Sequence, residues 1–198
     1  MKDCAWIVVD MLYDFIDGSL ACQGADEAVA KTLEFIQKHP DVPRIFVRDH
    51  HPANHCSFAA QGGPWPPHCV QGTHGAEIHK DLEPYADDEG LIFYKGENPA
   101  QEQYSGYEGL NEAGQTMGEV LRLMEIEKVL VCGIATEFCV RNTAEDILKD
   151  GFKVTVLKDC LAWVDAQGHV KAIEEMKHEE IHIGFSFSSI DSTDERMW

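Results

Sequence analysis

Residues 128–159, KVLVCGIATEFCVRNTAEDILKDGFKVTVLKD, contain a complete strand–helix–strand unit. The apolar, β-branched runs 128–133 and 153–159 predict two strands. Between them, Val140, Ala144 and Ile147 recur with the spacing of one face of a helix. Gly151 is an ordinary signal for the end of that helix. Strands that alternate with helices in this way predict a parallel sheet covered by helices on both faces.

The same alternation extends over the rest of the chain. Apolar residues recur with helical spacing at Val29, Leu33 and Ile36, and again within 117–124. We therefore predict an α/β fold with three αβα layers and one Rossmann-like, six-stranded, mainly parallel sheet in the order 3-2-1-4-5-6, forming a single domain over residues 1–198. The other predicted strands are 5–10, 44–49, 91–95 and 180–185.

The composition excludes several classes of protein. A net charge of −19 disfavours nucleic acid or an anionic membrane as a partner, because phosphate binding needs clustered Lys and Arg. The acidic runs, including 191–196, predict solvated surface. The N-terminus does not resemble a signal peptide, and no stretch approaches the length of a transmembrane helix. Seven cysteines without a Cys-x-x-Cys pair indicate free thiols in a reducing cytoplasm.

Reactive side chains follow successive predicted strands. Asp10, Asp49, Lys95 and Asp159 end four apolar runs, and the run 128–133 leads to Cys139. Ligands of open parallel sheets bind beyond the carboxyl ends of the strands, so these groups would share one edge. In the predicted order, Asp10 and Cys139 face the same crevice. Lys95 begins two strands away, and its long side chain would have to carry the ammonium inward.

Cys139 differs from the other cysteines in its setting. Thr136 is a candidate N-cap, which would place Cys139 in the first turn of a helix. The helix dipole there favours a thiolate, and the free N–H groups could bind an oxyanion. The residue pattern by itself leaves open whether Cys139 is a nucleophile or a buried packing residue. Cys132, inside a predicted strand, is expected to be a packing residue.

The residue pattern by itself leaves open whether a metal site lies beside this edge. Asp49 and His51 alternate in an extended segment, so both side chains can face one ion, and the stiff sequence before His68 can bring in a third ligand. Such ligands suit Zn²⁺, Fe²⁺, Mn²⁺ or Ni²⁺, and three of them leave positions open for a substrate. His55 could be a fourth ligand or could support another ligand. His50 is expected to point away.

Several segments together resemble the nicotinamidases, also called pyrazinamidases, of the isochorismatase-like cysteine hydrolases. The resemblance extends from about residue 5 to 178 and rests on segments such as VVDMLYDFIDGSL (8–20), VRDHHPANHCSF (47–58), GGPWPPHCVQGTHGAEIH (62–79) and GIATEFCVRNTAEDILKDGFKV (133–154). Two departures stand out: Leu12 and Tyr13 replace the Gln-Asn pair that is frequent in that family, and His74 replaces a usual Pro.

The resemblance implies an isochorismatase-type hydrolase fold and a cis bond between Ile134 and Ala135. It implies that the catalytic triad is Asp10, Lys95 and Cys139 and that the metal ligands are Asp49, His51 and His68. It also implies an oxyanion hole formed by the N–H groups of Ala135 and Cys139, and a pocket lined by Phe15, Leu20, Trp65 and Tyr104. It also implies one divalent metal ion, with Zn²⁺ first and Fe²⁺ or Mn²⁺ as alternatives. A homo-oligomer is left open.

The implied reaction is the hydrolysis of nicotinamide, and also of pyrazinamide, through a thioester, with release of ammonia. Asp10 would take the thiol proton and pass it to the ammonia, while Lys95 balances the charge. Two alternatives remain: hydrolysis of another small amide or an N-carbamoyl compound, and a non-catalytic metal-binding or redox-sensing protein. The predicted metal ligands argue against the first, and the presence of Asp10 and Lys95 beside Cys139 argues against the second.

Overall fold

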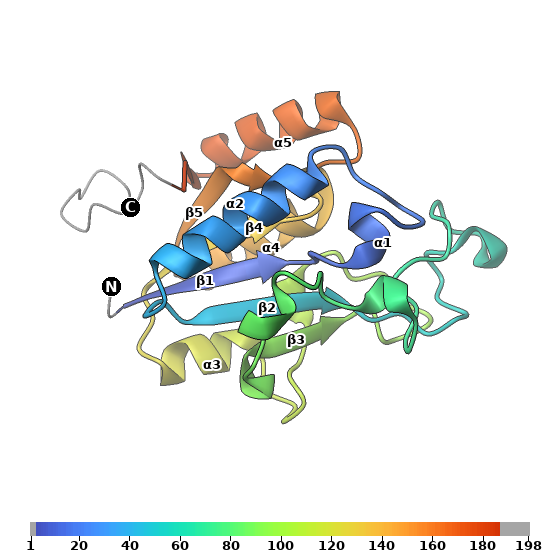
Figure 1. The fold of residues 1–198 in the computed structure, drawn as a ribbon, viewed down its shortest axis with the longest axis horizontal. Helices are drawn as coiled ribbons and strands as arrows, with labels where there is room; N and C mark the ends of the chain where they lie inside the picture. Colours follow the sequence, from blue (N-terminus) through green and yellow to red (C-terminus); the bar gives the residue numbers. More distant parts are fainter. Residues whose placement is uncertain (1–2, 187–198) are drawn as a thin grey trace.

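The computed structural model describes residues 3–186, in which six parallel strands form one sheet in the order β3-β2-β1-β4-β5-β6 (Figure 1). This confirms the predicted fold class and strand order. The strands are β1 (Cys4–Val9), β2 (Arg44–Asp49), β3 (Ile92–Lys95), β4 (Lys128–Gly133), β5 (Lys153–Leu161) and β6 (His182–Gly184).

Helices connect the strands and cover both faces of the sheet. The α-helices are α1 (Tyr13–Ile16), α2 (Ala25–Lys38), α3 (Met117–Leu123), α4 (Arg141–Lys149) and α5 (Ala166–His178). A π-helical turn, Thr136–Val140, leads directly into α4. Short 3₁₀ turns lie at Ala59–Gln61, His74–Ala76, Glu83–Tyr85, Glu89–Leu91 and Gly106–Glu108.

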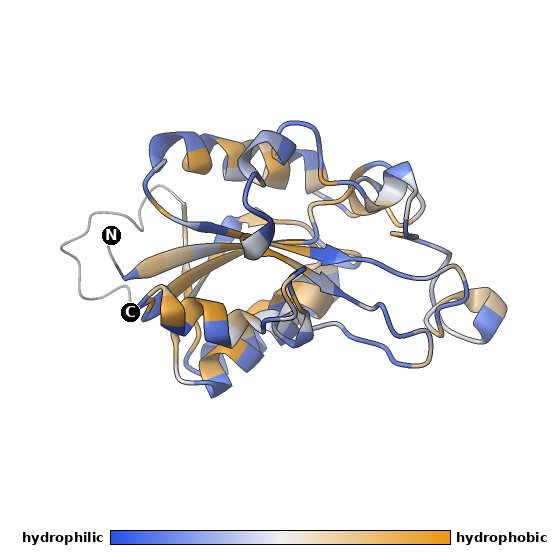
Figure 2. Ribbon diagram, turned by 90° about the horizontal axis from the view of Figure 1, so that it is seen from below, coloured by the Kyte–Doolittle hydropathy of each residue, from blue (hydrophilic) through white to orange (hydrophobic). Residues whose placement is uncertain are grey.

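The side chains of β1 alternate between two hydrophobic clusters. Trp6 and Val8 pack on the face that α1 and α2 cover, whereas Ala5, Ile7 and Val9 pack on the face that α3, α4 and α5 cover. Figure 2 shows the sheet between the two layers of helices. Because both faces are buried, the central strands are almost continuously apolar, and this is the pattern that made them visible in the sequence.

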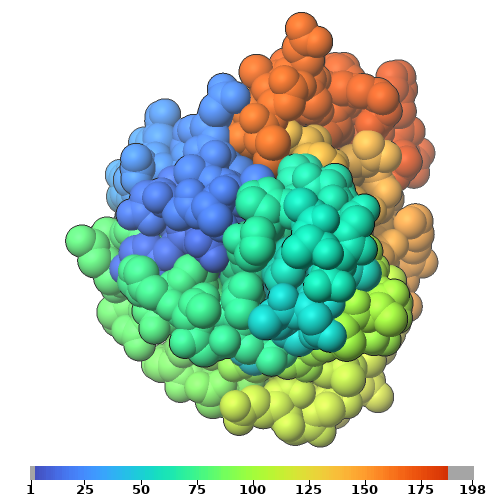
Figure 3. All heavy atoms as spheres, turned by 90° about the vertical axis from the view of Figure 1, so that its right-hand side faces the viewer, coloured from blue at the N-terminus to red at the C-terminus, as the bar shows by residue number. Residues whose placement is uncertain are grey.

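The strand register brings the predicted reactive residues to one edge. Val9, the last residue of β1, pairs with both Val47 of β2 and Gly133 of β4. Asp49, at the end of β2, pairs with Lys95, at the end of β3. The loops beyond this edge gather on one end of the molecule, where the segment near residues 50–75 lies beside the blue N-terminal segment (Figure 3).

Asp159 does not belong to this group. The strand β5 continues two residues past it, to Leu161, and the Asp159 carboxylate accepts hydrogen bonds from the backbone N–H and hydroxyl of Ser186 at 2.8 and 2.6 Å. Its prediction as a strand-end group at the shared edge was therefore wrong. The apolar run ends at Asp159 although the strand does not, so composition alone placed the end too early.

The structure tests some of the other sequence predictions only in part. Within residues 3–186, no helix combines the length and the apolar character needed to cross a membrane. The acidic run 191–196 lies outside the described residues. The extent of the single domain over 1–198 stays a prediction.

Gly133 joins β4 to the loop that precedes Cys139, and its backbone has φ +130°. A Cβ atom there would lie 2.0 Å from the carbonyl oxygen of Val9 in the neighbouring strand. We expect Gly133→Ala to lower the free energy of unfolding by about 2 kcal/mol or more, because backbone must move in the central strand pair. Urea unfolding monitored by circular dichroism measures the effect.

Gly151→Ala is the matched control for this prediction. Gly151 also has a positive φ, +95°, but a Cβ atom there would have nothing within 4 Å. Gly151→Ala should therefore lower the free energy of unfolding only by the backbone strain of a positive φ, about 1 kcal/mol. Equal losses for the two variants would show that the contact with Val9 is unimportant.

Candidate active site

The turn that carries Cys139 follows directly from β4. The peptide bond between Ile134 and Ala135 is cis, as the resemblance implied, and Thr136 begins the π-helical turn. The predicted side-chain N-cap at Thr136 was wrong. Its hydroxyl donates to the carbonyl of Ala162 at 2.9 Å, and its N–H donates to the same carbonyl at 2.9 Å. Thr136 therefore ties the turn to the end of β5.

Asp10, Lys95 and Cys139 meet in the interior. The Lys95 Nζ atom lies 2.9 Å from Asp10 Oδ2 and 3.5 Å from Cys139 Sγ, and it also bonds Asp49 Oδ1. The three side chains of the predicted triad are at most 6% exposed. Lys95 thus spans the two strand positions that the sequence left between β3 and β1. Asp10, Asp49 and Cys139 also lie close enough to one another to share a bound cation, but the Lys95 ammonium occupies the space among them.

Asp10 is held so that one carboxylate oxygen stays available. Oδ1 accepts the N–H of Asp49 at 2.9 Å, whereas Oδ2 has no well-aligned hydrogen-bond donor among residues 3–186. The backbone of Asp10 has φ +49°, a left-handed conformation that costs on the order of 1 kcal/mol for a residue other than glycine. This conformation places the carboxylate at the end of β1, beside Lys95 and the thiol.

The pKa values of the triad reflect burial opposed by charge pairing. Burial raises the pKa of Asp10 to about 6, although Lys95 opposes the shift. Burial also raises the pKa of the Cys139 thiol well above its usual value, and Lys95 again opposes it. For Lys95, burial would lower the pKa, but Asp10 and Asp49 outweigh it and hold the pKa well above normal. These shifts favour a neutral thiol rather than the thiolate that the helix-dipole argument suggested, so an attack by Cys139 would first need a proton acceptor, and Asp10 is beside it.

Asp49, His51 and His68 have the arrangement of a metal site. All three are buried, and one potential ligand atom from each lies within 4.8 Å of the others. The Nε2 atoms of His51 and His68 lie 3.4 and 3.9 Å from Asp49 Oδ2. Burial would raise the pKa of Asp49, but Lys95 and His51 outweigh it and hold the pKa below its usual value, so this candidate ligand is an anion. The donor set fits a divalent ion such as Zn²⁺.

Backbone carbonyls orient both imidazoles toward this set. The Nδ1 atom of His51 lies 3.0 Å from the carbonyl of Gly96, and that of His68 lies 2.8 Å from the carbonyl of Pro66. A carbonyl can only accept, so Nδ1 carries the proton and Nε2 keeps its lone pair for a metal. Gly96 has φ +70°, and a Cβ atom there would lie 2.3 Å from the His51 ring. The close approach thus requires glycine.

His55, the residue left open as a fourth ligand, supports His51 instead. Its Nε2 donates to the carbonyl of Gln101 at 3.0 Å, and its Nδ1 accepts from the Ser57 hydroxyl at 2.7 Å. Its ring stacks on that of His51 with centroids 4.1 Å apart. Both nitrogens are therefore occupied. His50 lies away from the cluster, as expected, with Nδ1 2.8 Å from Glu97.

A pocket adjoins the thiol and the candidate metal ligands, with about 360 Å³ of empty space that includes part of the open solvent at its mouth. Asp49, His68, Ala135 and Cys139 all contribute to its wall. All four predicted pocket residues line it. The full set of lining side chains is Phe15, Leu20, Asp49, Trp65, His68, Glu102, Tyr104, Ala135, Phe138, Cys139 and Val164.

Three lining residues were missed by the sequence reasoning. Phe138 precedes Cys139 in the quoted motif, and its position in the turn was a usable signal. It packs edge-to-face on Trp65, with centroids 5.2 Å apart. Val164 follows β5 in a loop that no pattern marked. Glu102 lies in an irregular segment after β3, where a single Glu carries no recognisable signal.

Glu137 fixes one side of the pocket. Its Oε1 accepts the backbone N–H groups of Val164 and Asp165 at 2.9 and 2.7 Å. Since Glu137 and Cys139 share the π-helical turn, this contact holds Val164 in a constant position relative to the thiol.

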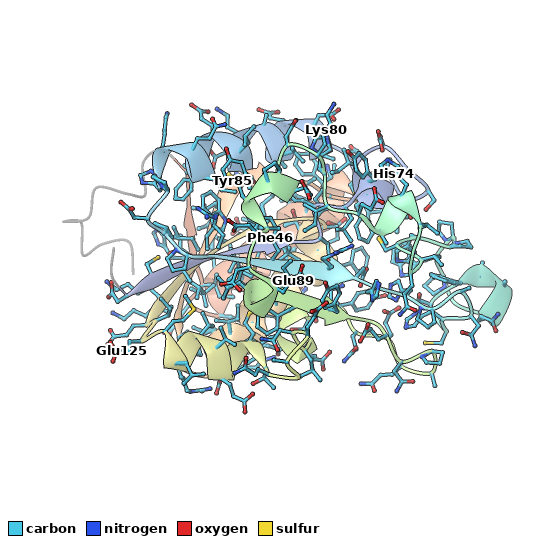
Figure 4. All side chains as sticks on the ribbon, turned by 60° about the horizontal axis from the view of Figure 1, so that its bottom comes forward. Phe46, His74, Lys80, Tyr85, Glu89 and Glu125 are labelled. Carbon is cyan, nitrogen blue, oxygen red and sulfur yellow. The ribbon has the colours of Figure 1, made fainter. Side chains whose placement is uncertain are left out.

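The two departures from the family pattern lie outside the pocket. Leu12 is fully buried in the core, whereas Tyr13 packs on His74 with ring centroids 3.9 Å apart. Figure 4 shows His74 at the outside of the molecule, toward the end where the site lies and far from Glu125. His74 is exposed and contacts Glu77 through Nδ1 at 2.6 Å. Neither Leu12 nor Tyr13 lines the pocket, so this departure does not alter a pocket-lining residue.

A thiol that meets a carboxylate and an ammonium at the carboxyl edge of a parallel sheet defines a cysteine hydrolase of the α/β class. The pattern of the isochorismatase domain matches residues 4–184, and the chain belongs to the isochorismatase family.

Relatives within this family share most of their length with the chain. A nicotinamidase/pyrazinamidase of Mycobacterium tuberculosis is 37% identical, over 90% of this chain and 97% of the relative. The crystal structure of a pyrazinamidase of Pyrococcus horikoshii in complex with zinc is 39% identical, with a TM-score of 0.81 over 92% of this chain and 99% of that one. The structure of PnC1 from L. infantum in complex with nicotinate is 32% identical, with a TM-score of 0.83 over 94% of both chains.

Proposed function

We propose that this protein is a metal-dependent amidohydrolase that converts nicotinamide to nicotinate and ammonia, and pyrazinamide to pyrazinoate. The observation that carries the proposal is the position of the pocket. Its wall contains both the thiol of Cys139, which Lys95 approaches to 3.5 Å, and two members of the Asp49–His51–His68 cluster. The names of the relatives agree with a small aromatic amide as the substrate.

The residues supply the groups that amide hydrolysis requires. Cys139 Sγ attacks the carbonyl carbon while its proton passes to Asp10. Asp10 then gives this proton to the departing nitrogen, which leaves as ammonia, and a thioester remains on Cys139. Water adds to the thioester carbonyl, releases the carboxylic acid and restores the thiol. The Lys95 ammonium compensates the charge of Asp10 throughout.

The oxyanion would lie against the N–H groups of Ala135 and Cys139. Ala135 lines the pocket, and its N–H makes no hydrogen bond among residues 3–186. The Cys139 N–H belongs to the π-helical turn, next to the reacting sulfur. Two donors from one turn would stabilise the charge that develops on the carbonyl oxygen.

Asp49, His51 and His68 would hold the metal ion, and we propose Zn²⁺. When bound, the ion would act as a Lewis acid toward the ring nitrogen of the amide. Phe15, beside His68 with ring centroids 5.4 Å apart, and Trp65 would pack against the aromatic ring and restrict its orientation.

The direct test is ammonia release from nicotinamide, pyrazinamide and a small N-carbamoyl compound by the purified protein. Release from the two aromatic amides is expected. Release from the N-carbamoyl compound alone would favour another cysteine hydrolase, and no release from any of them would favour a non-catalytic thiol protein.

Removal of the metal by a chelator is expected to raise KM for nicotinamide at least tenfold and to lower kcat. The reason is that the substrate ring would lose its principal polar contact. The measurement is steady-state ammonia release before and after dialysis, with the metal content of each sample determined. Restoration by added Zn²⁺ is the control, and unchanged KM and kcat in metal-free protein would contradict the role of Asp49, His51 and His68.

A further inference from the structure

Glu102 places a carboxylate in the wall of a pocket that is otherwise mainly apolar. It is half-buried and lines the pocket together with Tyr104 and Asp49. Burial is the largest cause of the raised pKa of Tyr104, and the Glu102 carboxylate adds to it. Glu102 also opposes the burial effect that lowers the pKa of His55. Its charge therefore acts on the side of the pocket near the histidines.

Within residues 3–186, no side-chain cation pairs with this carboxylate. Among residues 3–186, Glu102 forms no ion pair, and its Oε1 accepts only the backbone N–H of Gln103, at 3.1 Å. Asp49, the other carboxylate in the wall, is paired with Lys95. Glu102 is thus the one acidic side chain of the described pocket wall whose charge stays uncompensated.

The proposed reaction changes the charge of the molecule in the pocket. A carboxamide enters neutral, and an acid with a pKa far below neutral leaves as an anion. The Lys95 ammonium is already paired with Asp10 and Asp49, so the main attraction for this anion would come from the proposed divalent ion at Asp49, His51 and His68, and this attraction would delay its release. A negative charge in the wall opposes that attraction without affecting a neutral amide.

We propose that Glu102 determines the charge selectivity of the pocket: it weakens the binding of the anionic acid relative to the neutral amide and so promotes product release. This inference rests on the proposed amide hydrolysis. Two unit charges about 8 Å apart change a binding constant about 2-fold in water and about 30-fold at an effective dielectric constant of 20. Because Glu102 is half-buried, its effect on the binding constant should lie between these two limits.

The experiment compares Glu102→Gln, Glu102→Asp and the wild-type metalloenzyme. Glu97→Gln is the matched control, because it removes the same charge from the same segment outside the pocket, where Glu97 contacts His50. The measurements are KM for nicotinamide, the inhibition constant of nicotinate, and metal content, at low and high ionic strength.

We expect Glu102→Gln to lower the inhibition constant of nicotinate about 3- to 30-fold, with KM within about 2-fold of wild type. Glu102→Asp and Glu97→Gln should stay close to wild type, and added salt should reduce the difference. Three outcomes would overturn the proposal: an unchanged inhibition constant, an equal fall in KM, or a loss of metal from Glu102→Gln, which would make Glu102 part of the metal site. A wild type that releases no ammonia rejects the proposed function instead, and the inference falls with it.

Discussion

Cys139→Ala is expected to lower kcat for ammonia release from nicotinamide by about 10⁴-fold or more, because a thioester cannot form without the sulfur. The sulfur belongs to the only thiol of the described pocket wall, and it lies within reach of both Lys95 and Asp10. The substitution removes one atom from a buried position and leaves the ion pairs of Lys95 in place. The far-ultraviolet circular dichroism spectrum and the metal content should therefore stay unchanged.

Cys56→Ala is the control for this loss. Cys56 is partly buried, lies in the loop of the metal ligands and does not line the pocket. It should keep wild-type turnover. Equal turnover by Cys139→Ala and wild type would reject the assigned nucleophile even if nicotinamide is the substrate.

Lys95→Met is expected to be the most destabilising substitution at the site. The ammonium contacts the carboxylates of Asp10 and Asp49, and all three side chains are at most 5% exposed. Removing one partner of a buried charge pair costs about 3–5 kcal/mol, because the remaining charge stays buried without compensation. Here two carboxylates would face each other, so we expect a fall of this size in the free energy of unfolding and a loss of turnover. Urea unfolding of the metal-loaded protein measures the first effect.

Lys149→Met supplies the comparison at the surface. Lys149 pairs with Asp146 at 3.0 Å, but its side chain is 66% exposed. Little change in stability is expected there, since solvent screens such pairs. Adding Asp10→Asn to Lys95→Met should recover part of the lost stability, because it removes one of the two unpaired charges. A wild-type urea midpoint for Lys95→Met would contradict the importance of the buried charge network.

The central strands could be predicted because they are buried on both faces. A strand such as β4 must be apolar along its whole length, and this requirement is visible in the letters of residues 128–133. The same rule explains the error at Asp159, where one polar residue inside β5 was interpreted as the end of the strand. Ser186 donates a hydrogen bond to that carboxylate, and no local sequence pattern predicts a partner 27 residues away.

The site was predictable where residue type and strand position suffice. The ends of parallel strands meet at one edge, so Asp10, Asp49 and Lys95 could be grouped before any contact was known. The protonation state of Cys139 could not be predicted from residue type and strand position. A short helical turn suggested a thiolate, whereas burial raises the pKa of the thiol and leaves it protonated beside Asp10.

The sequence by itself determined the alternation of strands and helices, the edge of the sheet that carries the chemistry and, through its motifs, the family. Only the tertiary structure decided that two carboxylates and a thiol surround Lys95, that His55 supports His51 rather than offering a free nitrogen, and that Glu102 lines the pocket without an ion pair among residues 3–186. The physical reason is the range of the interactions. Periodicity and strand ends follow from neighbours along the chain, whereas burial, charge pairing and the free lone pairs of a site depend on groups that only folding brings together.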